Sequence, residues 1–212
     1  VLEYNHSLMI KTFSSRAVRL SPTNISFLEK KSDCVLDLKK SPHTKKPIVI
    51  DIGFGDAQSF AKDVLANKDY CFIGIEPYKK GFARAVEFYE KNKPDNLFLF
   101  NGDAREYIDS VKCKISFIRI HFPDPWPKKK HIKRRLVSKE FLNFIDSKTK
   151  KGCKIEIITD SKIYQDHIKE LLGTQRLFEI IDNFEISYEV STFHRKGLKK
   201  GHSIKRYVLQ KN

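Results

Sequence analysis

From about residue 47 onward, short apolar runs alternate with longer charged segments, and this alternation predicts an α/β fold. Two further observations support it. A Gly-x-Gly turn directly follows the first apolar run, and two β-like runs near the carboxyl end are separated by a basic stretch. We therefore predict a doubly wound, mostly parallel seven-stranded sheet with an antiparallel C-terminal hairpin.

Five parallel strands are expected, with intervening helices whose apolar positions recur three or four residues apart. The predicted strands are Pro47–Ile52, Tyr70–Glu76, Leu97–Asn101, Ile115–Phe122 and Lys154–Thr159. The predicted helices are Ser59–Asn67, Lys79–Lys91, Ala104–Val111, Ser138–Lys148 and Ser161–Leu172. The two late runs, Phe178–Tyr188 and His202–Gln210, are expected to pair at the sheet edge on either side of a basic loop.

Residues 1–46 show no strong periodicity, and Ser21-Pro22 and Ser41-Pro42 indicate turns. We expect this part to be a basic N-terminal arm and a helix that pack on the main domain. The main domain is predicted to span residues 47–212.

The composition is that of a globular chain, because 40% of its 212 residues are hydrophobic, with 16 Phe and 8 Tyr. No stretch approaches the roughly 18 apolar residues of a membrane span, and no secretory signal stands at the N-terminus, so a soluble cytoplasmic protein is expected. Neither the cysteines nor the histidines show the spacing of a metal site. We therefore expect no metal, and reduced cysteines at Cys34, Cys71, Cys113 and Cys153.

The formal net charge of +15 is unevenly distributed. Residues 119–135 hold seven Lys or Arg against Asp124 alone, and residues 195–206 hold six with no acid. Such clusters are typical of a surface that contacts phosphates, so a nucleic acid is the expected partner. Lys-rich composition by itself is weaker support, since a genome rich in A and T can enrich lysine without any such partner.

Acids and glycines follow three successive strands. Asp51 precedes the turn Gly53-Phe-Gly55, Glu76 ends the second strand 21 residues after Gly55, and Asp103-Ala104 follows the third. The carboxyl ends of parallel strands meet at one edge of the sheet, where doubly wound folds bind ligands. The glycines let the backbone approach a ligand, and a carboxylate such as Glu76 can accept hydrogen bonds from both hydroxyls of a ribose.

The turn also distinguishes between two kinds of nucleoside ligand. A dinucleotide fingerprint continues as G-x-G-x-x-G, whereas this chain has Gln58 in place of the third glycine. Acids close to the turn suit a sulfonium cofactor with an amino-acid tail better than a pyrophosphate. The sequence therefore favours a methyl donor over NAD.

A rigid acidic turn follows the fourth strand. Three prolines surround Asp124 in Phe122-Pro-Asp-Pro-Trp-Pro127, and a run of lysines begins at Lys128. An acid held in this way can face a base while the lysines contact phosphates. The alternative is a rigid turn that starts a solvated helix, with Trp126 packed on the domain rather than stacked on a base.

The segment Phe122–Leu136, FPDPWPKKKHIKRRL, resembles the signature of the bacterial tRNA (guanine-N7)-methyltransferase family. The resemblance extends over nearly the whole chain in the same order. The further matching segments are Thr12–Pro22, Asp51–Gly55, Gly74–Glu76, Gly102–Ala104, Thr159-Asp160 and Thr192–His202.

The resemblance implies a Rossmann-like class I methyltransferase fold, S-adenosyl-L-methionine as cofactor, and guanosine 46 in the variable loop of tRNA as acceptor. It implies that Asp124 is catalytic and also contacts the cofactor. The other cofactor-binding residues that we expect are Asp51, Gly53, Gly55, Glu76, Asp103 and Ala104. The residues that the resemblance implies for substrate binding are Lys128, Asp160, Ser191, Thr192, Phe193 and His194.

Three positions depart from the family pattern. Asp51 stands where the family commonly has Glu, and Ala57 replaces the last glycine of the turn, which is tolerable if the φ angle of Ala57 is negative. His194 stands where the family has Glu, so the carboxylate of the family pattern is missing at this position.

Methylation of guanine N7 needs no general base, because this nitrogen carries a free lone pair and no proton. Asp124 is then expected to position the base and to stabilise the positive charge that develops on it. Two alternatives stay open: a methyltransferase of the same fold with another substrate, and an RNA-binding protein on a degenerate methyltransferase fold. Either a monomer or a homodimer is compatible with the sequence.

Overall fold

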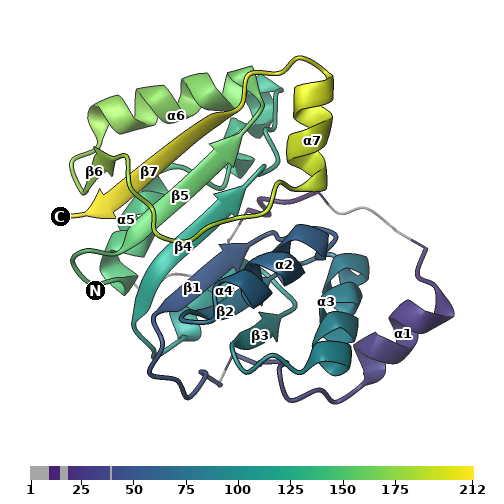
Figure 1. The fold of residues 1–212 in the computed structure, drawn as a ribbon. Helices are drawn as coiled ribbons and strands as arrows, with labels where there is room; N and C mark the ends of the chain where they lie inside the picture. Colours follow the sequence, from purple (N-terminus) through teal and green to yellow (C-terminus); the bar gives the residue numbers. More distant parts are fainter. Residues whose placement is uncertain (1–9, 15–18, 39) are drawn as a thin grey trace.

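The computed structural model describes residues 10–14, 19–38 and 40–212. Its centre is a seven-stranded sheet in the order β3-β2-β1-β4-β5-β7-β6 (Figure 1). The five strands from β1 to β5 run parallel, whereas β7 pairs antiparallel with both β5 and β6. The predicted fold class is confirmed.

The strands are β1 Ile48–Ile52, β2 Cys71–Ile75, β3 Leu97–Phe100, β4 Ile115–His121, β5 Lys154–Thr159, β6 Phe178–Ile181 and β7 Lys205–Lys211. The helices are α1 Pro22–Glu29, α2 Gln58–Ala66, α3 Lys79–Asn92, α4 Ala104–Ser110, the 3-10 helix η2 Lys129–Arg134, α5 Lys139–Lys148, α6 Lys162–Thr174 and α7 Thr192–Lys199. The five predicted parallel strands and their five helices all occur, and their bounds differ from those predicted by at most two residues.

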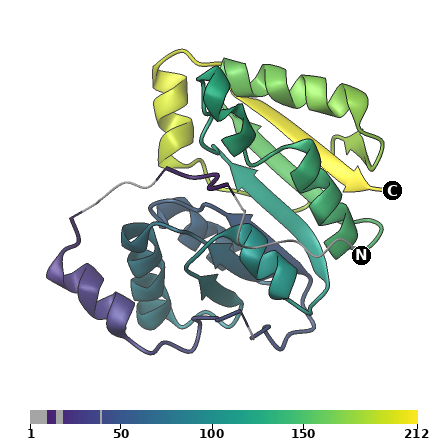
Figure 2. The same cartoon turned by 180° about the vertical axis from the view of Figure 1, so that it is seen from behind.

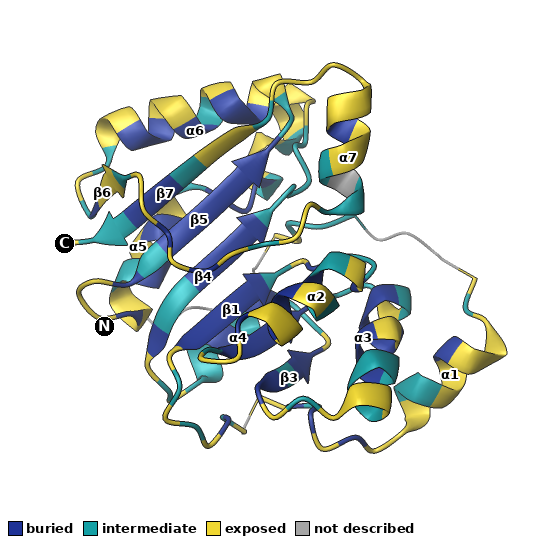
Figure 3. Cartoon of the chain, in the orientation of Figure 1, coloured by how far each residue is buried: buried dark blue, intermediate teal, exposed yellow. Residues whose placement is uncertain are grey.

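Helices cover both faces of the sheet. On one face α2 and α3 pack against β1, β2 and β3, and on the other α4, α5 and α6 pack against the same sheet (Figure 2). The inner strands are buried along their length, and the helices present exposed residues on their outer sides (Figure 3). Strands covered on both faces need continuous apolar runs, which is why they are readable in the sequence.

Serine side chains begin several of the helices. Ser21, Ser138, Ser161 and Ser191 each accept a hydrogen bond from a backbone N–H in the first turn of α1, α5, α6 and α7. Such caps satisfy amide groups that have no partner inside the helix.

The segment between α6 and β7 differs from the prediction in two ways. Of the run Phe178–Tyr188 only Phe178–Ile181 forms a strand, and beyond it Phe184 and Ile186 are buried against the α2–α3 face of the sheet. The expected basic loop instead contains helix α7, which lies beside the carboxyl ends of β4 and β5 (Figure 1). This helix is only eight residues long, with Gly197 inside it and two apolar residues, Phe193 and Leu198, which are too few to form a recurring apolar pattern in the sequence.

The amino-terminal part of the chain packs on the outer edge of the sheet. Helix α1 contacts α3, and Val35 forms a parallel bridge with Leu99 of β3. No helix in residues 10–14, 19–38 and 40–212 is long and apolar enough to cross a membrane.

Helix α3 approaches the turn after β1 so closely that only glycine fits at its third residue. A Cβ atom on Gly81 would lie 1.9 Å from the carbonyl oxygen of Gly55. We expect Gly81→Ala to lower the free energy of unfolding by about 1–3 kcal/mol, because the helix or the turn must move. Urea denaturation measures this change.

Gly173 in α6 is the matched control, because nothing lies within 4 Å of a Cβ atom built there. Gly173→Ala should raise the free energy of unfolding by up to about 1 kcal/mol through helix propensity. Equal effects of the two substitutions would contradict the close approach of α3 to the turn.

Candidate active site

A cavity of about 340 Å³ opens at the carboxyl ends of β1, β2, β3 and β4. Its volume lies in the usual range for small-molecule sites. Residues 12 and 13 of the amino-terminal segment close one side. The predicted site residues that line it are Gly53, Gly55, Glu76, Asp103, Ala104 and Asp124.

The turn between β1 and α2 alternates through the left-handed region. The φ angles of Gly53, Gly55 and Ala57 are +76°, +70° and +66°. The condition under which alanine would replace glycine here without strain, a negative φ angle, is therefore not met at Ala57. Because an L-residue with a Cβ atom is strained in this region, Ala57 holds a conformation that favours glycine.

Glu76 is the most deeply buried acid that lines the cavity, at 2% exposure. Its carboxylate accepts hydrogen bonds from the backbone N–H groups of Gly55 at 2.7 Å and Tyr78 at 2.9 Å. Burial nevertheless raises the pKa of Glu76 to about 7, against the lowering effect of these two bonds. The carboxylate thus ties the turn after β1 to the end of β2.

Asp103 caps helix α4 and is paired in a fork with Arg105. Its Oδ1 accepts from the backbone N–H and the Nε of Arg105, and its Oδ2 lies 2.6 Å from Nη2 of the same guanidinium. The same Nη2 donates to the carbonyl oxygen of Ile10 at 2.9 Å. Asp103 is therefore linked through Arg105 to the amino-terminal segment.

Asp51 is placed differently from the other acids. It is buried in β1, and its Oδ2 lies 3.2 Å from Nη2 of Arg119 in β4. It is not among the residues that line the cavity. Arg119 belongs to residues 119–135, which were predicted to form a basic surface, but its side chain is buried.

Asp124 lies at the cavity in a turn bounded by two strained aromatic residues. Phe122 and Trp126 have φ angles of +53° and +43°, and each precedes a proline. Arg135 supports the turn, because its guanidinium donates to the carbonyl oxygens of Pro125 at 3.0 Å and Trp126 at 3.4 Å. A buried arginine thus holds the backbone on the carboxyl side of Asp124.

Residues 10–14 cross this site as a strap. The backbone N–H of Ser14 donates to Oδ2 of Asp124 at 3.0 Å, and Nε1 of Trp126 donates to the carbonyl oxygen of Thr12 at 2.8 Å. The hydroxyl of Tyr78 contacts that of Ser14 at 3.0 Å. The sequence did not indicate these contacts, because the strap takes part in most of them through its own backbone groups, which are the same for every residue type.

Trp126 packs into the protein. Besides its bond to Thr12, its ring lies 4.4 Å from the guanidinium carbon of Arg134 and contacts the edge of His131. The interpretation of Trp126 as a residue that packs the turn on the domain fits these contacts.

Helix α7 brings several predicted substrate-binding residues to the other side of the site. The hydroxyl of Thr192 contacts Oδ2 of Asp56, in the turn after β1, at 3.3 Å. The ring of His194 lies 5.7 Å from that of Phe122, and its Nδ1 lies 3.4 Å from the hydroxyl of Tyr188. The side chain of Phe193 lies outside the described residues.

The remaining predicted substrate-binding residues have different surroundings. Asp160 follows β5, and its Oδ2 lies 2.9 Å from Nδ1 of His202, which comes just after α7. Lys128 is exposed at the start of η2. Burial and the neighbouring His121 lower the pKa of His194, so a neutral imidazole stands where the family pattern has an acid.

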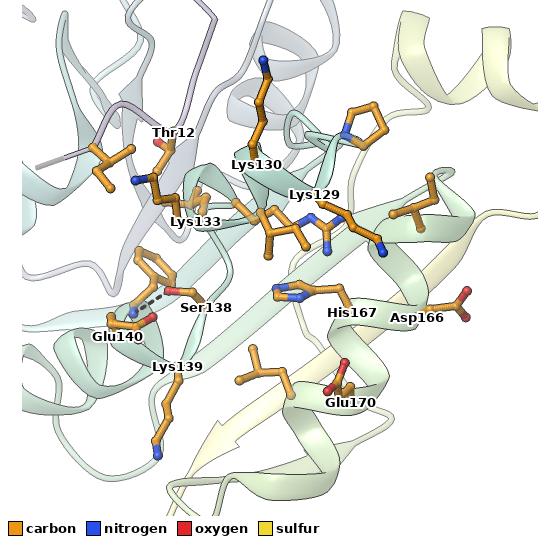
Figure 4. Close-up of a pocket in the computed structure, with 18 of the residues that line it drawn as sticks. Thr12, Lys129, Lys130, Lys133, Ser138, Lys139, Glu140, Asp166, His167 and Glu170 are labelled. Atoms are coloured by element: carbon orange, nitrogen blue, oxygen red, sulfur yellow. Dashed lines mark hydrogen bonds between the residues drawn. The ribbon is translucent and has the colours of Figure 1, made fainter.

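A wide trough of about 1430 Å³ adjoins the cavity and shares Thr12 and Leu136 with it. Lys129, Lys130 and Lys133 lie on one side, and Asp166 and Glu170 of α6 on the other (Figure 4). The basic surface is thus smaller than the sequence suggested. Three arginines of the two basic segments contact other parts of the protein. Arg119 pairs with Asp51, Arg135 donates to the turn around Asp124, and Arg206 pairs with Glu156.

Within the described ranges, no three His, Cys, Asp or Glu side chains are grouped so that they could hold a metal ion. All four cysteines are free, and burial raises the pKa of Cys71 and Cys153 to about 12. They are packing residues.

The cavity fits a nucleoside. Glycines at the turn leave the backbone open to close approach, and a buried carboxylate at the end of β2 can accept hydroxyl donors. Glu76 supports this fit. Burial raises its pKa, so hydrogen-bond donors brought by a ligand would stabilise its ionised form.

Comparisons with known proteins agree with this geometry. A family model described as "Putative methyltransferase" matches residues 45–207. A tRNA (guanine-N(7)-)-methyltransferase of Wolbachia pipientis is 35% identical, over 97% of this chain and 94% of its own length. One of Acinetobacter baylyi is 30% identical, over 95% of this chain and 88% of its own.

Among solved structures, the aminoglycoside resistance methyltransferase NpmB1 superposes with a TM-score of 0.56. It is 16% identical, and the match covers 80% of this chain and 89% of that one. At this identity the likeness concerns the fold alone.

The left-handed conformation of Ala57 leads to a stability prediction. Ala57→Gly removes the Cβ strain, worth about 1–2 kcal/mol, at an entropic cost of about 0.4–1 kcal/mol in the unfolded chain. We expect a net gain of about 0.5–1 kcal/mol in the free energy of unfolding, measured by urea denaturation.

Ala61, inside helix α2, provides the comparison. Ala61→Gly should cost about 1 kcal/mol, as expected for glycine in a helix interior. A loss of stability in Ala57→Gly as large as in Ala61→Gly would argue against the strained turn.

Proposed function

The chain belongs to the tRNA (guanine-N7)-methyltransferase family, and on this premise we propose that it methylates N7 of guanosine 46 in the variable loop of tRNA. S-adenosylmethionine is the methyl donor of this family. The observation that carries the proposal is the position of Asp124, an acid held in a rigid turn at the mouth of the cofactor cavity.

The residues at the strand ends divide the binding of the donor between them. Glu76 would accept the ribose hydroxyls, and Asp103 the adenine amino group, while Gly53 and Gly55 let the backbone approach the amino-acid tail. Ala104, the first residue of α4, lines the same cavity and would contact the adenine. When bound, S-adenosylmethionine supplies the methyl group at a positively charged sulfur.

Asp124 orients the acceptor base. Each oxygen of a carboxylate has two lone pairs, so Asp124 can accept from guanine N1–H and the exocyclic amino group even while Ser14 donates to Oδ2. A carboxylate here also favours the positive charge that develops on the purine. No residue has to remove a proton, because N7 carries none.

The substrate side is formed by α7 and the start of η2. Ser191, Thr192, Phe193 and His194 are proposed to contact the tRNA near the reacting base, with Asp160 behind them and Lys128 on a phosphate. In this chain His194 presents a ring beside Phe122. We propose that it contacts the RNA by stacking, in place of the hydrogen bonds that a carboxylate would accept.

Freeing the variable-loop base costs a few kcal/mol, and contacts to phosphates offset this cost. Lys128, Lys129, Lys130 and Lys133 are exposed around the trough, and Arg195 and Lys199 are exposed on α7. These two groups flank the Asp124 turn. Such a surface disfavours a small-molecule acceptor.

Incubation with labelled S-adenosylmethionine and unmodified tRNA tests the proposal. We expect label in N7-methylguanosine after digestion and mass spectrometry, and its loss when guanosine 46 is replaced by another nucleoside. Label in a different nucleoside would support the alternative hypothesis of a methyltransferase with another substrate. No label at all would support the hypothesis of an RNA-binding protein.

The same assay tests the role of Asp124. Asp124→Asn keeps an acceptor for Ser14 but removes the charge, and Asp124→Ala removes both. Methyl transfer should fall about a hundredfold or more with little change in tRNA affinity, as for other electrostatic groups of this kind. The exposed Asp182 provides the control variant Asp182→Ala. Activity within twofold of the wild-type value in both Asp124 variants would remove its catalytic assignment.

For the basic surface we predict that Lys128→Ala and Arg195→Ala each weaken tRNA binding and reduce the slope of log affinity against log salt by about 1. The affinity for S-adenosylhomocysteine should not change. Lys151→Ala is the control, because Lys151 is exposed at the opposite end of the sheet, before β5. A salt slope equal to that of the wild type in both variants would rule out these phosphate contacts.

A further inference from the structure

Three charged side chains lie side by side within the sheet. Asp51 in β1, Arg119 in β4 and Glu156 in β5 are register partners across neighbouring strands. They are 3%, 2% and 0% exposed. Placing charges where water cannot reach them is costly, so each needs partners inside the protein. Those of Glu156 are His121 and Arg206.

Arg119 makes all its ion pairs through one nitrogen. Its Nη2 pairs with Oδ2 of Asp51 at 3.2 Å and with Oδ2 of Asp63 in helix α2. Its Nε and Nη1 are buried without a hydrogen-bond partner. An ion pair that leaves buried donors unsatisfied contributes little net stability, and apolar residues would often serve better. Stability alone therefore does not explain why an arginine stands here.

The two partners of Arg119 lie on either side of the turn between β1 and α2, residues 53–57, which we call the cofactor turn. Asp51 stands two residues before Gly53, and Asp63 belongs to α2, the helix that follows the turn. Both ends of the turn are thereby joined to one guanidinium in β4, the strand that leads to Asp124.

Asp63 also connects this cluster to the substrate side. Its Oδ1 accepts a hydrogen bond from the backbone N–H of Glu189, two residues before the cap of α7. A second bond joins the same two regions, from the side chain of Asn67 to the carbonyl oxygen of Ser187 at 3.1 Å. The segment that carries α7 is thus docked on α2 from inside the protein.

We infer that Arg119 is a positioning residue, which through Asp51 and Asp63 fixes the cofactor turn relative to both Asp124 and helix α7. It touches neither ligand in this role. The inference rests on the proposed function for the assignment of the turn to the cofactor and of α7 to the RNA. It also explains the position of Asp51, which is shorter than the Glu that the family commonly has there. Asp51 pairs with Arg119 and does not line the cavity.

The first variant is Asp63→Asn. Asparagine keeps the shape of the side chain and an oxygen for the N–H of Glu189, but it loses the charge that faces Arg119. We expect the dissociation constant for S-adenosylhomocysteine, measured by calorimetry, to rise about tenfold. We also expect the KM for tRNA to rise, at a temperature where the variant is fully folded by circular dichroism.

The matched control is Lys62→Ala, at the preceding position of the same helix. Nζ of Lys62 pairs with the side chain of the same Glu189 at 3.1 Å, but on the surface, with the lysine side chain 63% exposed. This substitution removes an external link between the same two segments. Both binding constants should stay within twofold of the wild-type values.

Arg119→Lys is the second variant, because lysine keeps the charge but has a shorter reach and no planar guanidinium, so its nitrogen cannot occupy the position of Nη2 between the two acids. It should show the same pattern as Asp63→Asn. If both variants bind S-adenosylhomocysteine and use tRNA as the wild type does while only their melting temperature falls, the positioning role is overturned. Failure of both to fold would overturn it too, in favour of a purely structural cluster.

Failure of the proposed function gives a different result. A wild-type protein that binds S-adenosylhomocysteine but does not methylate tRNA contradicts the proposed function, while the calorimetric comparison still tests Arg119. A wild-type protein that methylates tRNA, with variants that are unaffected, contradicts only the inference about Arg119.

Discussion

The parallel pairing of β1 to β5 is the constraint on which the rest of the molecule depends. Because five strands point the same way, their carboxyl ends meet, and residues far apart in the chain come to one edge. Glu76, Asp103 and Asp124 share a cavity for this reason. Strand β7 is antiparallel to β5, so it begins at this same edge. Helix α7, which precedes β7 in the chain, therefore lies there too.

Backbone strain is concentrated at this edge. Ala57 in the cofactor turn and Phe122 and Trp126 around Asp124 all have positive φ angles, which side chains with a Cβ atom rarely adopt. Both turns are supported from outside: the one that contains Ala57 by the close approach of α3 to Gly55, the one around Asp124 by prolines, by Arg135 and by the strap. On the proposed function, a turn fixed by its surroundings would hold Asp124 in place before the substrate binds, which lowers the cost of alignment.

The sequence predicted the parallel strands well because strands covered on both faces must be continuously apolar, as Ile48–Ile52 is. Six of the seven residues predicted to bind the cofactor line the cavity for a related reason, since strand ends are readable from the same runs, whereas Asp51 does not line it. The sequence did not predict α7, an eight-residue helix with only two apolar residues, nor the burial of Arg119, whose partner Asp63 is 56 residues away. The strap escaped prediction because its contacts are made largely by backbone atoms.

The ionisation of Glu76 has a thermodynamic consequence. Because burial raises its pKa to about 7, this acid is partly protonated in the free protein at neutral pH. Hydroxyl donors favour the ionised carboxylate and so lower its pKa, which means that a ligand bound through its ribose expels a fraction of a proton into solution. The heat of such binding depends on the ionisation enthalpy of the buffer, and acidification competes with the ligand for the same oxygen atoms.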